Sequence, residues 1–172
     1  MKKFRIGGRY WSVLVGIIPM LDDEDRMMSD IANGGCLCGA VRFEVAGPPL
    51  WVAHCHCHSC RRSTGAPVTT FVGFRYSNFT FNTGSSGVYE SSPGVWRRFC
   101  TTCGTPLSYE ADRYDDEIHI YISTLDHPED YPAQSHVFYG ERISWFDVHD
   151  SAPRFVATAR ERNIVAHGPV DE

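Results

Sequence analysis

Cys55-His56-Cys57-His58-Ser59-Cys60 is the longest of three cysteine clusters in a chain of 172 residues. The others are Cys36-Leu37-Cys38 and Cys100-Thr101-Thr102-Cys103, and none of the seven cysteines lies outside the three clusters. Spacings of C-x-C and C-x-x-C direct neighbouring thiolates at one point, as metal ligation requires. Four thiolates close a tetrahedral zinc site, whereas three leave a zinc ion with one open position. The clusters therefore predict one closed and one open metal site.

Disulfide bonds are the competing explanation for so many cysteines. An odd number of thiols leaves at least one of them unpaired. Cysteines one residue apart are also poorly placed for a relaxed disulfide, whose Cα atoms lie several ångströms apart in a set geometry. The spacing therefore favours metal ligation over disulfide formation or redox chemistry.

The order of the clusters suggests how the cysteines divide between two sites. The first and third clusters are two-cysteine knuckles far apart in the sequence, and such pairs commonly meet at one zinc ion. The second cluster then remains as a compact local group. Spacing alone leaves the other divisions open. On this division the four-cysteine cluster is Cys36, Cys38, Cys100 and Cys103, and the trio is Cys55, Cys57 and Cys60.

The composition indicates a single domain with a hydrophobic core. Hydrophobic residues make up 42% of the chain and aromatic residues 13%. A net charge of −5 argues against a nucleic-acid partner, because such domains usually present a basic patch. Two arginine pairs, Arg61-Arg62 and Arg97-Arg98, stand beside cysteine clusters. They are either solvated surface or groups that offset the negative charge of thiolate–zinc centres.

The first 33 residues differ from the rest of the chain. An apolar stretch from Trp11 to Leu21 follows basic residues, as in a signal peptide, but no small-residue cleavage site comes after it. The stretch is too short to span a membrane. Metal-binding cysteines must stay reduced, which favours a cytoplasmic location. We expect an extension over 1–33, or an extra strand or helix that packs on a partner, then a zinc-binding domain over 34–156 and a tail over 157–172.

Strand patterns dominate and predict a mainly β fold. Residues 41–45 alternate apolar and charged side chains, the period of a half-buried strand. In 117–122 three isoleucines share one face, and a glutamate, a histidine and a tyrosine share the other. Only Ser59 to Gly65 resembles a helical turn. Further strands are expected over 67–74, 78–81, 95–99, 107–109, 136–139 and 143–147.

Three motifs resemble the glutathione-dependent formaldehyde-activating enzyme family, which includes centromere protein V. They are GGCLCGAVRF at 34–43, HCHCHSCRRSTGAP at 54–67 and FCTTCGTPL at 99–107. Residues 136–155, with Trp145 and Pro153-Arg154-Phe155, are similar to the family's closing segment. The resemblance covers about residues 34–156. The extension departs from the family pattern, in which the first cysteine motif lies nearer the start.

The resemblance implies an Mss4-like fold of twisted β-sheets with zinc-ribbon-like knuckles. It also implies two Zn²⁺ ions per chain and glutathione as co-substrate. A structural zinc would lie on Cys36, Cys38, Cys100 and Cys103. A catalytic zinc would lie on Cys55, Cys57 and Cys60.

The family's reaction suggests a carbon–sulfur lyase-type enzyme. A thiol, with glutathione the first candidate, would add to formaldehyde or a related small aldehyde through a zinc-bound thiolate. The partners would then be small molecules, with no nucleic acid and no membrane. The alternative is a zinc-stabilised binding module without catalysis, as the Mss4 relationship permits.

Several residues near the trio have open roles. The three histidines that interleave the trio are either ligands and proton carriers or ordinary surface and supporting groups. The arginine pair after the trio either binds a substrate carboxylate or is solvated. Three aromatic residues either line a pocket or pack in the core. These residues are His54, His56 and His58, then Arg61 and Arg62, and finally Phe74, Tyr76 and Trp96.

Overall fold

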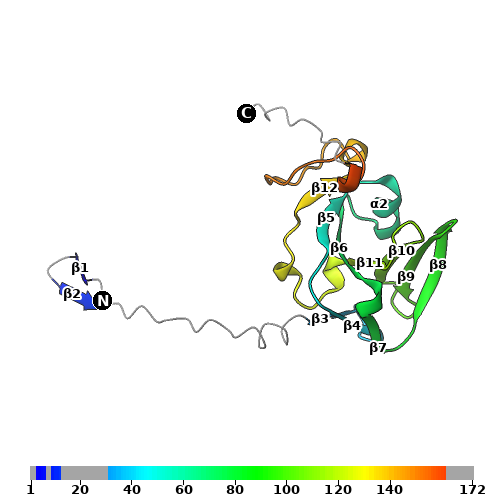
Figure 1. Cartoon of the computed structure of the whole chain (residues 1–172), viewed down its shortest axis with the longest axis horizontal. Coiled ribbons are helices and arrows are strands. Elements are labelled where there is room, and N and C mark those ends of the chain that lie inside the picture. The colour runs from blue at the N-terminus through cyan, green and yellow to red at the C-terminus, as the bar shows by residue number, and fades with distance from the viewer. Residues whose placement is uncertain (1–2, 7–8, 13–30, 162–172) are drawn as a thin grey trace.

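The computed structural model describes residues 3–6, 9–12 and 31–161, and the predicted mainly β fold is confirmed there (Figure 1). In the expected extension, β1 (Lys3–Ile6) pairs antiparallel with β2 (Arg9–Ser12). Most of the apolar stretch from Trp11 to Leu21, and the tail from 162 onward, lie outside the described residues. No helix in the described part of the chain is long and apolar enough to cross a membrane.

Ten strands of the described residues form two sheets. The smaller sheet has the order β3-β4-β7, and both of its pairings are antiparallel. The larger has the order β12-β5-β6-β11-β10-β9-β8, in which only β12 and β5 pair in parallel (Figure 1). The strands are β3 (Ile31–Gly35), β4 (Arg42–Ala46), β5 (Trp51–Cys55), β6 (Thr69–Arg75), β7 (Phe79–Thr83), β8 (Ser86–Ser92), β9 (Val95–Cys100), β10 (Pro106–Ala111), β11 (Glu117–Tyr121) and β12 (Ser135–Val137).

The α-helix α2 (His58–Thr64) lies where the sequence predicted a helical turn. Its N-cap is Cys57, whose sulfur accepts the backbone N–H of Cys60. It ends at Gly65, whose φ of 68° is a left-handed conformation that favours glycine. Short 3₁₀-helices connect other elements: Tyr76–Asn78, Ile122–Thr124, Pro128–Asp130, Tyr139–Glu141 and Ala159–Glu161.

The centre of the larger sheet is covered on both faces. Ile118 and Ile120 of β11 are fully buried in a core that includes Phe43 of the smaller sheet. The opposite face of β11 carries the glutamate, histidine and tyrosine of the sequence pattern, and it is also covered. His119 and Tyr121 are buried there, and Tyr121 packs with Phe71. The first face holds the two sheets together, and the second is the floor of the site described below.

The prediction of a strand over 143–147 is wrong. These residues form a turn in which the N–H of Phe146 donates to the carbonyl oxygen of Ile143 at 3.0 Å, and Trp145 is exposed. The physical reason lies at the edge of the sheet. β12 already pairs with β5 on one side, and His136 forms a parallel bridge with Arg154 on the other.

Two strands, β5 and β8, lie where the sequence predicted none. β5 is buried at three of its five positions, so it lacks a clear alternation. β8 lies between two serine- and glycine-rich segments that read as turns. β3 also includes residues 31–33, which we assigned to the extension.

Gly34 tests the contact between β3 and the core. A Cβ at this position would meet the ring of Phe43 and would lie 2.5 Å from the backbone oxygen of Thr124. We expect Gly34→Ala to lower the free energy of unfolding by about 1–3 kcal/mol, as overpacking does. Gly140→Ala is the matched control, because a Cβ there meets nothing within 4 Å. Equal thermal unfolding of both variants would contradict the described packing.

The boundary between the N-terminal extension and the zinc-binding domain stays a prediction, and it can be tested separately. The core strand β3 begins at Ile31, and the resemblance to the family begins at Gly34. We therefore expect a chain that starts at Met28 to fold and to keep its full metal content. Aggregation of this shortened chain, measured by light scattering, would show that the omitted residues pack on the domain or on a partner.

Candidate metal centres and an adjoining pocket

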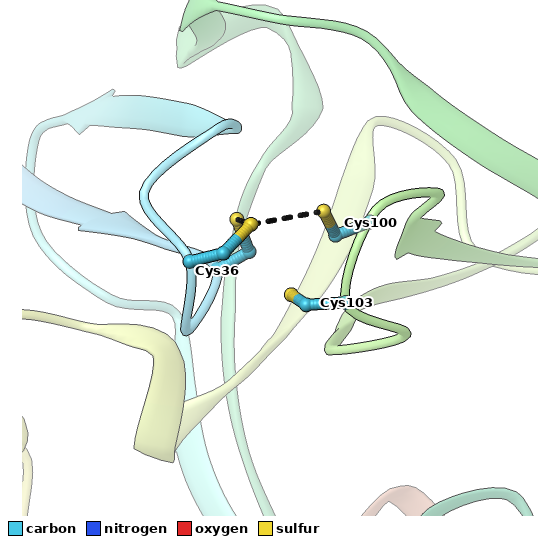
Figure 2. Close-up of side chains that lie close together, drawn as sticks. Cys36, Cys100 and Cys103 are labelled. Carbon is cyan, nitrogen blue, oxygen red and sulfur yellow. Dashed lines mark hydrogen bonds between the residues drawn. The ribbon is translucent and has the colours of Figure 1, made fainter.

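The four-cysteine cluster joins the two sheets. Cys36 and Cys38 lie between β3 and β4 of the smaller sheet. Cys100 ends β9 of the larger sheet, and Cys103 lies in the loop between β9 and β10. Figure 2 shows the sulfurs of Cys36, Cys100 and Cys103 turned toward a common point from two loops. One ligand atom from each of the four cysteines lies within 4.8 Å of the others. The fold therefore brings together the two distant cysteine pairs that the sequence analysis grouped at one site.

The sulfur spacing of this cluster fits a tetrahedral metal ion. The Sγ atoms of Cys36 and Cys38 are 3.5 Å apart, and those of Cys38 and Cys100 are 3.8 Å apart. Zn–S bonds of about 2.3 Å at tetrahedral angles place sulfurs about 3.8 Å apart. The four cysteines can therefore hold a zinc ion with little movement.

Backbone and side-chain donors support thiolates in this cluster. The N–H of Val41 donates to the buried sulfur of Cys36 at 3.2 Å. The hydroxyl of Thr105 lies 3.1 Å from the sulfur of Cys103 and, as the largest cause, lowers the pKa of that thiol to about 5. Thr105 also accepts the N–H of Leu37 at 3.1 Å, so one hydroxyl links the two knuckles.

The trio is a local group at the start of α2. Cys55 ends β5, Cys57 caps the helix and Cys60 lies in its first turn, and the three sulfurs lie within 4.8 Å of one another. Cys57 accepts the N–H of Cys60 at 3.3 Å. Hydrogen bonds from the thiols of Cys55 and Cys60 lower the pKa of Cys57 to about 2. Three sulfurs in this arrangement could hold a metal ion and leave one position for a ligand.

Arg97 places a positive charge beside the trio. It is buried, and its guanidinium lies 4.0 Å from the sulfur of Cys60. Its other donors are held by Ser59 at 2.9 Å, Tyr121 at 3.0 Å and Ser63 at 3.2 Å. Arg97 can therefore offset the negative charge of thiolates on the trio. Of the two roles predicted for the arginine pairs, this one fits Arg97 better than a place on the solvated surface.

The other paired arginines have different partners. Arg98 forms a salt bridge with Glu110 at 2.7 Å. Arg61 donates to the backbone oxygen of His56 at 2.9 Å and so braces the loop of the trio. Arg62 is exposed. None of these three guanidiniums lines the pocket described below.

The interleaved histidines do not join the trio. Their potential ligand atoms are not grouped with the three sulfurs within the described residues. His54 bonds the hydroxyl of Thr70 at 2.7 Å. His58 is exposed and bonds Glu141 at 2.9 Å. Both histidines therefore have partners other than the sulfurs of the trio.

His56 belongs to a buried network. Its Nε2 lies 2.9 Å from Nδ1 of His136, and Nε2 of His136 lies 3.0 Å from Asp150. Burial lowers the pKa of His56 to about 4, so the ring is neutral at pH 7. In the arrangement in which a singly protonated His136 donates to Asp150, its Nδ1 accepts from Nε2 of His56, so each ring determines the tautomer of the other. The network therefore anchors the loop that carries Cys55 and Cys57.

A pocket of about 730 Å³ opens beside the trio, on the second face of the larger sheet. The sulfurs of the trio and the guanidinium of Arg97 border one part of it. Much of the remaining wall is aromatic and comes from strands distant in sequence. The alternation in β11 indicated that His119 lies on a separate face from the isoleucines. No local sequence pattern indicated that the other aromatic residues line a pocket. The aromatic wall comprises Trp51, Phe71, Tyr109, Tyr114, His119 and Phe138.

The aromatic residues proposed from the sequence lie elsewhere. Phe74 is fully buried in the core between the sheets. Tyr76 and Trp96 border a second, separate hollow with Glu110. Core packing is therefore the role of Phe74, and none of the three lines the pocket at the trio.

The architecture and the two cysteine clusters define a mainly β protein with two potential metal centres, one of them beside a pocket. The chain belongs to the glutathione-dependent formaldehyde-activating enzyme family, whose model matches residues 31–141. A protein of Halomonas elongata, named "Putative glutathione-dependent formaldehyde-activating enzyme", is 26% identical over 128 residues, which are 69% of this chain and 81% of that protein. A crystal structure of a Rhodobacter sphaeroides protein is 26% identical, with a TM-score of 0.48 over 57% of this chain and 93% of that one.

The two clusters are expected to differ in what their metals support. Cys103→Ser breaks the cluster that joins the sheets, and metal binding there contributes directly to folding. We expect the melting temperature to fall by about 10 °C or more, since about 1 kcal/mol corresponds to roughly 2–4 °C at this size. Cys57→Ser should leave a folded protein, because β5 and α2 keep their backbone hydrogen bonds.

Elemental analysis with thermal unfolding checks this division. We expect two zinc ions in the unmodified protein and one in Cys57→Ser. Unfolding of Cys57→Ser together with a stable Cys103→Ser would reverse the assignment of the two clusters. One zinc ion or less in the unmodified protein would remove the second site.

Proposed function

We propose that the chain is a zinc-dependent carbon–sulfur lyase-type enzyme that adds a thiol to an aldehyde. Cys36, Cys38, Cys100 and Cys103 would hold a structural zinc ion, and the trio a catalytic one. Glutathione is the first thiol to consider, because the family is named for it. The observation that carries the proposal is the position of the trio, whose three cysteines line a pocket large enough for a small-molecule ligand.

A zinc ion on the trio would supply one open position, which favours the ionised form of a substrate thiol. In the reaction the thiol loses its proton to solvent and its sulfur lone pair forms the new C–S bond. The π electrons of the carbonyl move to oxygen, which takes a proton from solvent. The product is a hemithioacetal, and the same steps in reverse give the lyase direction.

The chain's own residues assist in two ways. The fixed positive charge of Arg97 lies beside Cys60 and favours a sulfur anion near the trio. The pocket wall confines thiol and aldehyde together, which lowers the entropic cost of their encounter. Both substrates are small molecules, and the reduced thiols that the site needs suit a cytoplasmic location.

The test measures exchange, because the uncatalysed addition already proceeds. Magnetisation transfer between glutathione and its hydroxymethyl adduct is followed with and without the zinc-loaded protein. We expect the protein to raise the exchange rate and Cys57→Ser to return it to background. Arg62→Gln is the control, since Arg62 is exposed and outside the pocket, and it should exchange like the unmodified protein. No acceleration by a fully zinc-loaded protein would favour the non-catalytic binding module.

A further inference from the structure

The pocket wall has a character that formaldehyde does not require. Its volume of about 730 Å³ falls in the range of sites that enclose drug-sized ligands. His119 stacks on Tyr109 with ring centroids 5.3 Å apart, and its other neighbours include Trp51 at 4.6 Å and Tyr114 at 4.8 Å. Burial lowers the pKa of His119, so this ring is neutral and extends the aromatic surface. Such a surface favours a flat, apolar group.

The indole of Trp51 can pack against the sheet because position 73 is a glycine and has no side chain. Trp51 of β5 pairs with Gly73 of β6. A Cβ on Gly73 would lie 2.5 Å from Nε1 and 2.7 Å from Cζ2 of the indole. The ring therefore lies directly against the sheet, and its Nε1 donates to Glu117 at 3.3 Å. This close approach leaves the space above the indole open to the pocket.

Most charges around the pocket are already paired. Arg160 forms an ion pair with Glu117, and a hydrogen bond from His119 lowers the pKa of Glu117 to about 2. Arg97 is held by two serines and a tyrosine beside the trio. Arg113, like Arg97, has no carboxylate partner within the described residues, but it is held by Tyr109 and Tyr114 and not by residues beside the cysteines. The pocket therefore carries a positive charge at Arg113 that no carboxylate of the described residues offsets.

Tyr109 contacts both this charge and the arginine beside the trio. Its ring lies 5.0 Å from the guanidinium of Arg97, which in turn contacts Cys60. Its hydroxyl accepts from Arg113 at 2.9 Å. One guanidinium therefore lies over the face of this phenol and the other lies at its hydroxyl. A flat ligand alongside Tyr109 can thus approach both the trio beside Arg97 and the free charge of Arg113.

We propose that the pocket selects an aromatic aldehyde that carries one carboxylate. The ring would pack against Trp51, Tyr109 and His119, the carboxylate would bind Arg113, and the carbonyl carbon would face the trio. This inference rests on the proposed function, because the aldehyde would accept the thiol there. The C–S bond forms as described above, with the carbonyl oxygen protonated by solvent.

Binding of an unreactive analogue tests the pocket without catalysis. The probe is 4-(hydroxymethyl)benzoate, titrated calorimetrically into the zinc-loaded protein. Benzyl alcohol lacks the carboxylate, and trans-4-(hydroxymethyl)cyclohexanecarboxylate lacks the aromatic ring. We expect each to bind about tenfold more weakly or worse, since a hydrogen bond to a charged group contributes about 1.5–3 kcal/mol and ring contacts about 0.5–1.5 kcal/mol beyond area burial.

Two arginine variants assign the carboxylate site. Arg113→Gln should bind 4-(hydroxymethyl)benzoate about as weakly as benzyl alcohol, whose own affinity should not change. Arg113→Lys should restore part of the preference. Arg62→Gln should behave like the unmodified protein, because Arg62 does not line the pocket. Equal affinities for the benzoate and benzyl alcohol, or a benzoate affinity that Arg113→Gln leaves unchanged, would overturn the proposal.

Exchange kinetics separate this inference from the proposed function. With glutathione, kcat/KM for 4-carboxybenzaldehyde should exceed that for formaldehyde by about tenfold or more. Acceleration of formaldehyde exchange alone would overturn the aromatic preference and leave the proposed function standing. Binding that depends on Arg113, without acceleration for any aldehyde, would support the ligand class and remove the proposed enzyme function.

Discussion

Repulsion between neighbouring thiolates is the constraint on which this structure depends. Four cysteine sulfurs from two separate sheets lie within 4.8 Å of one another. If all were ionised they would repel strongly, unless a cation lay between them. Cys36 and Cys100 are also buried among the core residues that the sheets share. The attachment of one sheet to the other therefore combines apolar packing with an electrostatic condition that a metal ion can satisfy.

The larger sheet separates this structural region from the proposed site of chemistry. Along β11, Ile118 and Ile120 point to the core between the sheets, while Glu117 and His119 line the pocket. Because side chains alternate along a strand, one strand serves both regions without sharing residues between them. Changes on the pocket face can therefore alter ligand contacts while the core between the sheets keeps its packing.

The sequence predicted those features that short-range patterns encode. Cysteine spacing is local, and it predicted metal ligation by the three clusters. The grouping of Cys36 with Cys100, apart from the trio, came from the order of the clusters and from the resemblance to the family. Alternation of residue types predicted β4 and β11, although β11 is buried on both faces. It failed for β5, in which apolar residues occupy both faces, and for 143–147, where the sheet edge is already occupied. The pocket was not predictable, because Trp51, Tyr109 and Arg113 meet only through strand order and register.

The close contact of Trp51 with the backbone at Gly73 has a consequence for how substrate range could diversify. The depth of the pocket depends on a missing methyl group in the strand beneath the indole. A side chain at position 73 would overlap the indole and displace it from the sheet, which would change the shape of the pocket without touching the cysteines. A single substitution at position 73 could thus convert a pocket for ring-sized molecules into a pocket for one-carbon molecules. Substrate size in this architecture is therefore adjustable independently of the metal chemistry beside it.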